Sequence, residues 1–188
     1  PTIALIEANL TVLNVDGGED YRLRTLKPAE IFFVPDNDEN EQKLSDLFKN
    51  MSGGVAAEAG ISVIHGREIP HKAKSEQVIW FDFRALCFGP RSQADYLYLA
   101  EHYEIVFLSG LERLTPQEKA EARRLTWLID VLYDYRVKLC ATSKVGVDDI
   151  YVEGDFAQEF TRTASRMVEM QSEAYLKLPH LTLNAPKS

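Results

Sequence analysis

The sequence has little cysteine and no long apolar run. Only two cysteines, Cys87 and Cys140, occur among 188 residues, and neither belongs to a CxxC motif or a Cys/His cluster. This argues against a disulfide framework and a zinc site, and it favours reduced, buried thiols in a cytosol-like compartment. The apolar runs are strand-sized and fall far short of the roughly 20 residues that cross a bilayer. We therefore expect no membrane insertion.

The sequence also lacks the signatures of most catalytic sites. No GxxxxGK[ST] phosphate loop occurs, so this chain by itself has no recognisable means of holding a nucleoside triphosphate and is expected to be inactive alone. The four histidines have no metal-ligand spacing, and no strained Ser or Cys nucleophile motif is present. We therefore assign no metal ligands and expect no covalent catalysis.

Acidic charge is in excess. The chain carries 29 Asp and Glu against 21 Lys and Arg, a net charge of -8, which repels phosphate backbones and anionic lipid. Nucleic acid is therefore not an expected partner. With 45% hydrophobic and 27% charged residues the composition is that of an ordinary globular protein. The first residue is Pro1 rather than methionine, and we expect the chain to begin inside a longer protein.

Local patterns predict an α/β chain in two parts and a tail. Residues 1–91 are expected to form a helix and β-rich subregion, residues 92–178 an α/β part, and residues 179–188 a loose tail. The elements expected in the first part are a helix over residues 3–10, a strand over 11–15, a short strand over 31–34, a helix bearing Leu44, Leu47, Phe48 and Met51, and antiparallel strands within 61–86.

The second part alternates helices and strands. Ser92 with Asp95 and Thr115 with Glu118 form capping boxes that predict two helix starts. Strands are predicted over 105–108 and 137–141, and a final long helix from about Asp155 to Leu178. The strand, helix, strand unit of residues 105–141 should be parallel, as in an α/β sheet.

Two sets of polar residues are candidates for a site. Thr142 and Ser143 end the predicted strand, where open α/β sheets place groups that face a ligand; the alternative is that one of them caps the following turn. Arg162 and Arg166 are four residues apart on the final helix, a spacing that presents two guanidinium groups to one anion. The alternative is a solvated face on which Glu159, Glu169 and Glu173 pair with them.

Three stretches taken together resemble one family. They are Asp16-Gly-Gly-Glu-Asp-Tyr-Arg22, residues 81–96 with Phe81-Asp-Phe-Arg-Ala-Leu-Cys87 and Ala94-Asp-Tyr96, and Glu159-Phe-Thr-Arg-Thr-Ala-Ser-Arg166 with Glu169-Met170. In this order and spacing they are similar to the ZapE/AFG-type ATPases, AAA-like P-loop proteins of the bacterial cytoplasm and of mitochondria. The resemblance runs from Pro1 to about Leu178. The sequence departs from the family pattern at Ser109-Gly110, where the family has a more acidic pair.

The resemblance implies that this chain is the C-terminal half of such a protein, with the P-loop half upstream. Its fold would be the C-terminal portion of a P-loop NTPase (AAA-like) fold. The intact protein would hydrolyse ATP with Mg²⁺ and act on a protein partner, in cell division for the bacterial branch and in protein turnover for the mitochondrial branch. The family's Phe-x-Arg-Thr-x-Ser-Arg motif would make Arg162 and Arg166 contacts of the γ-phosphate, in cis or from a neighbouring subunit of a homo-oligomer. The runner-up function is a non-enzymatic protein-interaction module.

Overall fold

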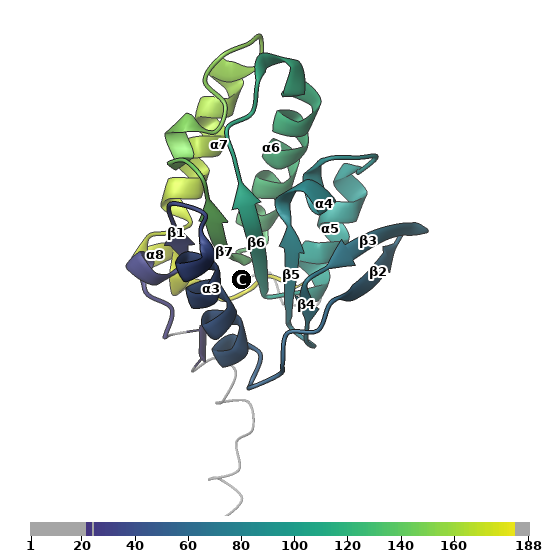
Figure 1. Ribbon diagram of the computed structural model, residues 1–188, viewed down its shortest axis with the longest axis vertical. Coiled ribbons are helices and arrows are strands. Elements are labelled where there is room, and N and C mark those ends of the chain that lie inside the picture. Colours follow the sequence, from purple (N-terminus) through teal and green to yellow (C-terminus); the bar gives the residue numbers. More distant parts are fainter. Residues whose placement is uncertain (1–21, 24, 183–188) are drawn as a thin grey trace, which may run out of the picture.

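The computed structural model describes residues 22–23 and 25–182. Its elements are helices and the strands of a central sheet and of a separate hairpin (Figure 1). In chain order they are η2 (Pro28–Glu30), β1 (Phe32–Phe33), α3 (Asp38–Met51), β2 (Gly60–Ile64), β3 (Arg67–His71), β4 (Ala73–Lys74), β5 (Val78–Asp82), α4 (Phe83–Cys87), α5 (Gln93–His102), β6 (Ile105–Leu111), η3 (Pro116–Glu118), α6 (Lys119–Asp134), β7 (Lys138–Ser143), η4 (Val147–Asp149), α7 (Ala157–Glu169) and α8 (Glu173–Leu176). The predicted helix over 3–10, the strand over 11–15 and the motif at 16–21 lie outside the described residues.

The main sheet has five strands in the order β1-β7-β6-β5-β4. β1, β7, β6 and β5 are parallel, and only the two-residue β4 runs antiparallel, to β5. The predicted parallel unit of residues 105–141 is thereby confirmed. The antiparallel strands expected within residues 61–86 are found in the pairs β2–β3 and β4–β5. β5 also pairs in parallel with β6, which was not expected, because its apolar run is buried on both faces. The sheet contains β1, β4 and β5 from the first expected part, residues 1–91, and β6 and β7 from the second, residues 92–178.

Helices cover both faces of the sheet, and alternate strand residues divide between two cores. On one face α3 packs Leu44, Phe48 and Met51 against the row Trp80, Phe107 and Cys140. On the other face α5, α6 and α7 pack against the row that contains Phe81, Leu108 and Ala141. Both cysteines are buried and unpaired with each other, as predicted. The long apolar stripe of α6 faces this second core, which confirms the helix predicted after Thr115.

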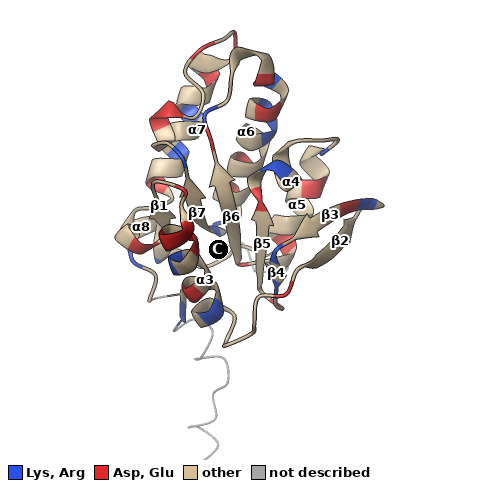
Figure 2. Ribbon diagram, viewed as in Figure 1, with Lys and Arg blue, Asp and Glu red and all other residues tan. Residues whose placement is uncertain are grey.

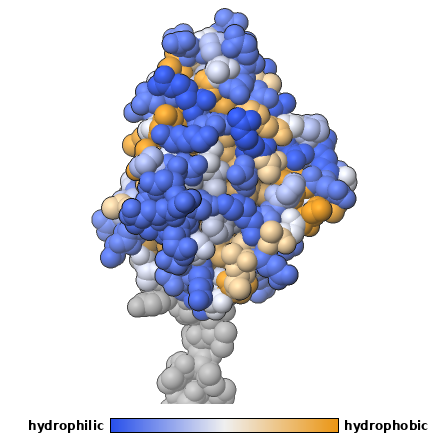
Figure 3. Space-filling view, viewed as in Figure 1, coloured by the Kyte–Doolittle hydropathy of each residue, from blue (hydrophilic) through white to orange (hydrophobic). Residues whose placement is uncertain are grey.

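A β-hairpin, β2 and β3, projects from the main body beside α5 (Figure 1). Its two-residue turn has positive φ at His65 (49°) and Gly66 (76°), the geometry of the turns that favour hairpins. Ile61 and Val63 alternate with buried residues along β2 and are 59% and 65% exposed. Figure 3 shows hydrophobic surface in the region of this hairpin. Arg67 joins this hairpin to α5 by donating to Asp95 at 3.0 Å.

The long C-terminal helix predicted from about Asp155 to Leu178 is wrong, because the chain forms two helices there. α7 ends at Glu169, and α8 starts at Glu173 after a turn. Ser172 stops a continuous helix: its Oγ accepts from the Tyr175 N–H at 3.2 Å and caps α8. No helix in the described part of the chain has the length and apolar character needed to cross a bilayer.

Candidate functional site

Polar side chains follow the apolar row beneath α3 at the carboxyl ends of three parallel strands. Asp82, Ser109 and Thr142 each come two residues after a member of the row Trp80, Phe107 and Cys140, and so lie on the α3 face of the sheet. Ser109 is 3% exposed and Thr142 is fully buried. A buried polar group requires a partner, and α3 supplies one.

That partner is Glu41, in the first turn of α3. Ser109 Oγ lies 2.9 Å from each carboxylate oxygen of Glu41, and Thr142 Oγ1 donates to Oε2 at 3.4 Å. Trp80 Nε1 donates to Ser109 Oγ at 2.8 Å, so the Ser109 proton is available to Glu41. The Lys72 ammonium also donates to Glu41 and lies 4.8 Å from the centre of the Trp80 ring. Glu41 therefore joins α3 to β6, β7 and the β3–β4 link.

An open cleft of about 220 Å³ lies beside this cluster. It is lined by Asp36, Asn37, Asp38, Glu41, Lys72, Asp82, Ser109 and Gly110. Four carboxylates thus face one ammonium, and acidic residues gather at the start of α3 (Figure 2). Within the described residues, no three His, Cys, Asp or Glu side chains are grouped so that they could hold a metal ion. The excess of carboxylates over the single ammonium of Lys72 disfavours a phosphate anion in this cleft.

The two residues at the end of β7 point to opposite faces of the sheet. Thr142 Oγ1 accepts from the Gly110 N–H at 3.1 Å and faces Glu41. Ser143 Oγ donates to the Val145 carbonyl at 2.6 Å and accepts from the Val145 N–H at 3.3 Å, so Ser143 caps the turn after β7. Both hydroxyls have partners within the chain, and a nucleotide contact by either residue stays a prediction.

A second ionic cluster lies at the same edge of the sheet, around Glu112. Arg84 and Lys144 approach its carboxylate at 2.5 and 2.9 Å. Burial alone would raise the pKa of Glu112, but the hydrogen bond from Lys144 and the charge of Arg84 outweigh it and lower the pKa below 4.5. The three residues come from α4, from the end of β6 and from the end of β7, so the cluster fastens these strand ends together.

Arg162 and Arg166 converge on one carboxylate, as their spacing predicts, and that carboxylate is Asp130 of α6. Arg162 Nη2 lies 3.1 Å from Asp130 Oδ2, and Arg166 Nη1 lies 2.5 Å from Oδ1. The Arg166 guanidinium also lies 4.8 Å from the centre of the Tyr133 ring and is 25% exposed, whereas the Arg162 side chain is 66% exposed. Arg166 therefore contacts both Asp130 and the Tyr133 ring, whereas Arg162 contacts Asp130.

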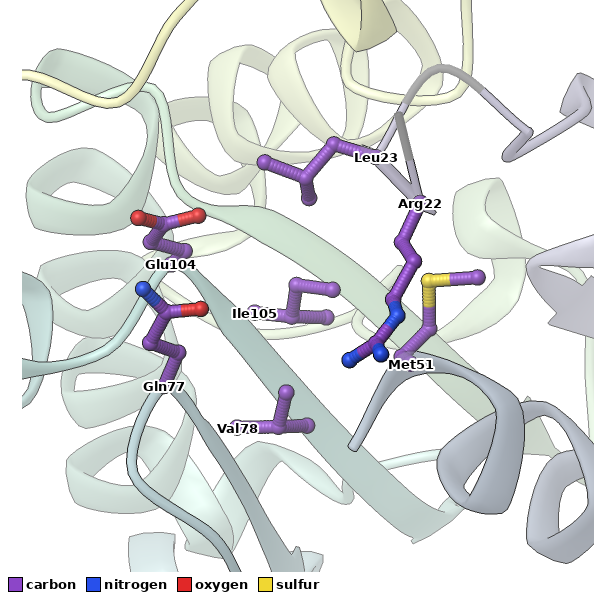
Figure 4. Close-up of a pocket in the computed structure, with 7 residues that line it drawn as sticks. All are labelled: Arg22, Leu23, Met51, Gln77, Val78, Glu104 and Ile105. Carbon is purple, nitrogen blue, oxygen red and sulfur yellow. The ribbon is translucent and has the colours of Figure 1, made fainter. Parts of the chain in front are cut away.

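The opposite edge of the sheet carries a much smaller hollow (Figure 4). Its lining comes from the amino-terminal ends of β5 and β6, the end of α3 and the chain before η2: Arg22, Leu23, Met51, Gln77, Val78, Glu104 and Ile105. The volume of about 10 Å³ is that of one water molecule. Ligands of open α/β sheets bind at the carboxyl ends of the strands, so this hollow is not the candidate site.

The sheet order, the covering helices and the polar carboxyl edge define an α/β domain of the P-loop NTPase-like kind. A family model described as AFG1-like ATPase matches residues 1–179, and the chain belongs to this family. It is 36% identical over 181 residues to cell division protein ZapE of Escherichia coli K12, covering 96% of this chain and 48% of that protein.

Two eukaryotic relatives extend the comparison. An uncharacterized protein of Schizosaccharomyces pombe is 30% identical over 209 residues, covering 95% of this chain and 46% of that protein. Lactation elevated protein 1 homolog B of Danio rerio is 24% identical over 210 residues, covering 93% of this chain and 42% of that protein. The chain thus spans about half the length of these curated relatives. No solved structure matches it.

Residues of these clusters that sequence reasoning missed include Glu41, Lys72, Glu112 and Asp130. A signal for Glu41 was present, because it stands three residues before Leu44 and seven before Phe48 and so heads the apolar stripe of α3. A carboxylate on such a stripe must find polar partners in the core. Lys72 and Asp130 have no comparable local signal.

Proposed function

We propose that the protein to which this chain belongs hydrolyses ATP with Mg²⁺ and uses the reaction to act on a protein partner. The observation that carries the proposal is the match to the AFG1-like ATPase family over residues 1–179. This chain would be the half without the phosphate loop, and the nucleotide would be held by the other half. The relative named as a cell division protein supports a partner in the division machinery and a cytoplasmic location; a mitochondrial location is the alternative.

Arg162 is our first candidate for the arginine that contacts the γ-phosphate, and Arg166 is the second. An arginine in that position stabilises the charge that develops as the phosphoryl group is transferred. Arg162 makes one hydrogen bond to Asp130 and is mostly exposed, so its guanidinium can leave Asp130 at little cost. Arg166 would have to give up both Asp130 and the Tyr133 ring. If the arginine acts across a subunit interface, the protein forms a homo-oligomer.

The test is the ATPase rate of the full-length protein with Arg162→Ala and with Arg166→Ala. We expect Arg162→Ala to lower kcat by at least about 100-fold, with a KM for ATP that changes far less. Arg123→Ala is the matched control, because Arg123 is also exposed on α6 and its guanidinium lies over the Phe156 ring, 5.5 Å from the ring centre. Wild-type rates for both variants would remove the arginines from the mechanism.

The second candidate function is a protein-interaction module that binds no nucleotide. The specific observation in its favour is the carboxylate of Glu41 at the edge where a P-loop NTPase-like fold would face its ligand. Under this proposal, Arg162 and Arg166 serve only to fasten α7 to α6 through Asp130. An ATPase rate of zero in the full-length protein, with an intact fold, would favour the module.

A further inference from the structure

The ligand crevice of an open α/β sheet can be located from topology alone. It lies at the carboxyl ends of two neighbouring strands whose connections leave to opposite faces of the sheet. Here these strands are β1 and β7: β1 leads to α3 on one face, and β7 leads to α7 on the other. On the α3 side of this crevice, Glu41 binds Thr142 at the end of β7 and Ser109 at the end of the neighbouring strand β6.

An anion already occupies this crevice, and it belongs to the chain. The Glu41 carboxylate receives hydrogen bonds from two buried hydroxyls and from the Lys72 ammonium, the kinds of donor that hold a phosphate in a nucleotide site. Because the donors at the ends of β6 and β7 are directed at Glu41, an entering phosphate would have to displace it. A displaced carboxylate would then stand beside the phosphate charge.

The loop and helix start beside the crevice are also closed to phosphate. In a phosphate loop the free N–H groups at the start of the helix bind the anion. In this chain Asn37 Oδ1 accepts from the Asn40 N–H at 2.9 Å, and Asn40 Nδ2 donates to the Pro35 carbonyl at 2.8 Å. Asp36 and Asp38 flank this helix start with negative charge.

We propose that this crevice is a nucleotide-type site closed by its own ligand, in which the Glu41 carboxylate takes the place of a phosphate. The chain therefore excludes ATP and inorganic phosphate from its own sheet. Removing the carboxylate leaves Ser109, Thr142 and Lys72 without their anion and opens a site for one. The inference is independent of the arginine proposal, because it concerns a different cluster and its test measures no hydrolysis.

The first test needs no variant. Mg-ATP, and separately inorganic phosphate, is titrated into the wild-type chain while the backbone amide signals of Ser109, Gly110 and Thr142 are followed by NMR. We expect no saturable shift of these three signals. Saturable shifts at these residues in the wild-type chain would overturn the proposal, whatever the ATPase activity of the full-length protein.

The second test opens the crevice with Glu41→Ala and supplies the missing anion. Thermal unfolding is measured in sodium phosphate and in sodium chloride at equal ionic strength. We expect Glu41→Ala to unfold at a lower temperature than wild type, and phosphate at ten times its Kd to raise that temperature by about 3 to 6 °C relative to chloride.

Glu39→Ala is the matched control, because Glu39 lies in the same helical turn, is 76% exposed and pairs only with Lys43 in the contacts of this turn. It should show no selective effect of phosphate, and nor should wild type. An equal phosphate effect in all three proteins, or none in a folded Glu41→Ala, would overturn the claim that Glu41 holds a phosphate position. If Glu41→Ala does not fold, the wild-type titration decides the proposal.

Discussion

Lys138 should make the stability of this protein rise with pH above neutrality. Its side chain is 1% exposed, and its ammonium donates to three carbonyls, those of Arg136 at 3.0 Å, Tyr175 at 3.1 Å and Leu178 at 2.6 Å. Burial, together with the charge of Arg136, lowers the pKa of Lys138 from 10.5 to about 8. The Arg136 carbonyl lies just before β7, whereas the Tyr175 carbonyl lies in α8 and the Leu178 carbonyl just after it. This one side chain therefore ties the C-terminal region to the start of β7.

The direction of the effect follows from proton linkage. The lowered pKa means that between pH 8 and 10.5 the unfolded chain binds more protons at this lysine than the folded chain does. Stability therefore rises with pH across this window. A pKa lowered from 10.5 to about 8 corresponds to about 3.4 kcal/mol, of which about 2.5 kcal/mol is realised between pH 7 and pH 10.

The perturbation is Lys138→Met, which keeps the length and volume of the side chain and removes the titrating group. The free energy of unfolding of wild type and variant is measured by urea denaturation between pH 7 and pH 10. We expect the advantage of wild type over the variant to grow by about 2.5 kcal/mol over this range. A buried tyrosine with a raised pKa, such as Tyr96, titrates in both proteins and cancels in the difference. A difference that stays constant with pH would refute the reasoning.

Two further predictions concern ion pairs that join elements distant in the sequence. Asp95→Ala should destabilise the fold by about 2 to 3 kcal/mol in urea, since it removes a fully buried carboxylate that pairs with Arg67 and caps α5; a loss below about 0.5 kcal/mol would contradict this. Glu112→Gln should act on acid stability. Because the pKa of Glu112 is lowered, its contribution is present above pH 4.5 and is lost as the pH falls below it. The effect should stay below about 1 kcal/mol because Arg84 and Lys144 are exposed, and acid titrations of variant and wild type that superimpose would count against it.

Much of the local structure could be predicted from the sequence because its signals are local. The capping box at Ser92 and the one at Thr115 each involve residues three apart, and both helices begin there. The hairpin turn at His65-Gly66 likewise depends on two adjacent residues. The prediction of one long final helix was wrong because the apolar periodicity of residues 155–178 continues past the point where Ser172 caps a new helix.

The candidate site could be predicted only in part. The spacing of Arg162 and Arg166 predicted that their guanidinium groups lie together, but their partner in the structure is Asp130, which lies 32 and 36 residues earlier in the chain and was not predicted. The position of Thr142 at a strand end was also predictable. Its neighbour there, Glu41, is 101 residues away, and no pattern in either segment refers to the other.

The sequence by itself determined the class of fold, the places where most elements begin and end, and the family. Periodicity, caps and turns are properties of neighbouring residues, so they can be recognised without knowledge of the fold. Only the tertiary structure decided that β5 joins β6 in parallel, that Asp130 binds the two arginines and that Glu41 binds the hydroxyls at the ends of β6 and β7. These contacts join residues far apart in the chain, and they form because the packing of two cores brings their elements together.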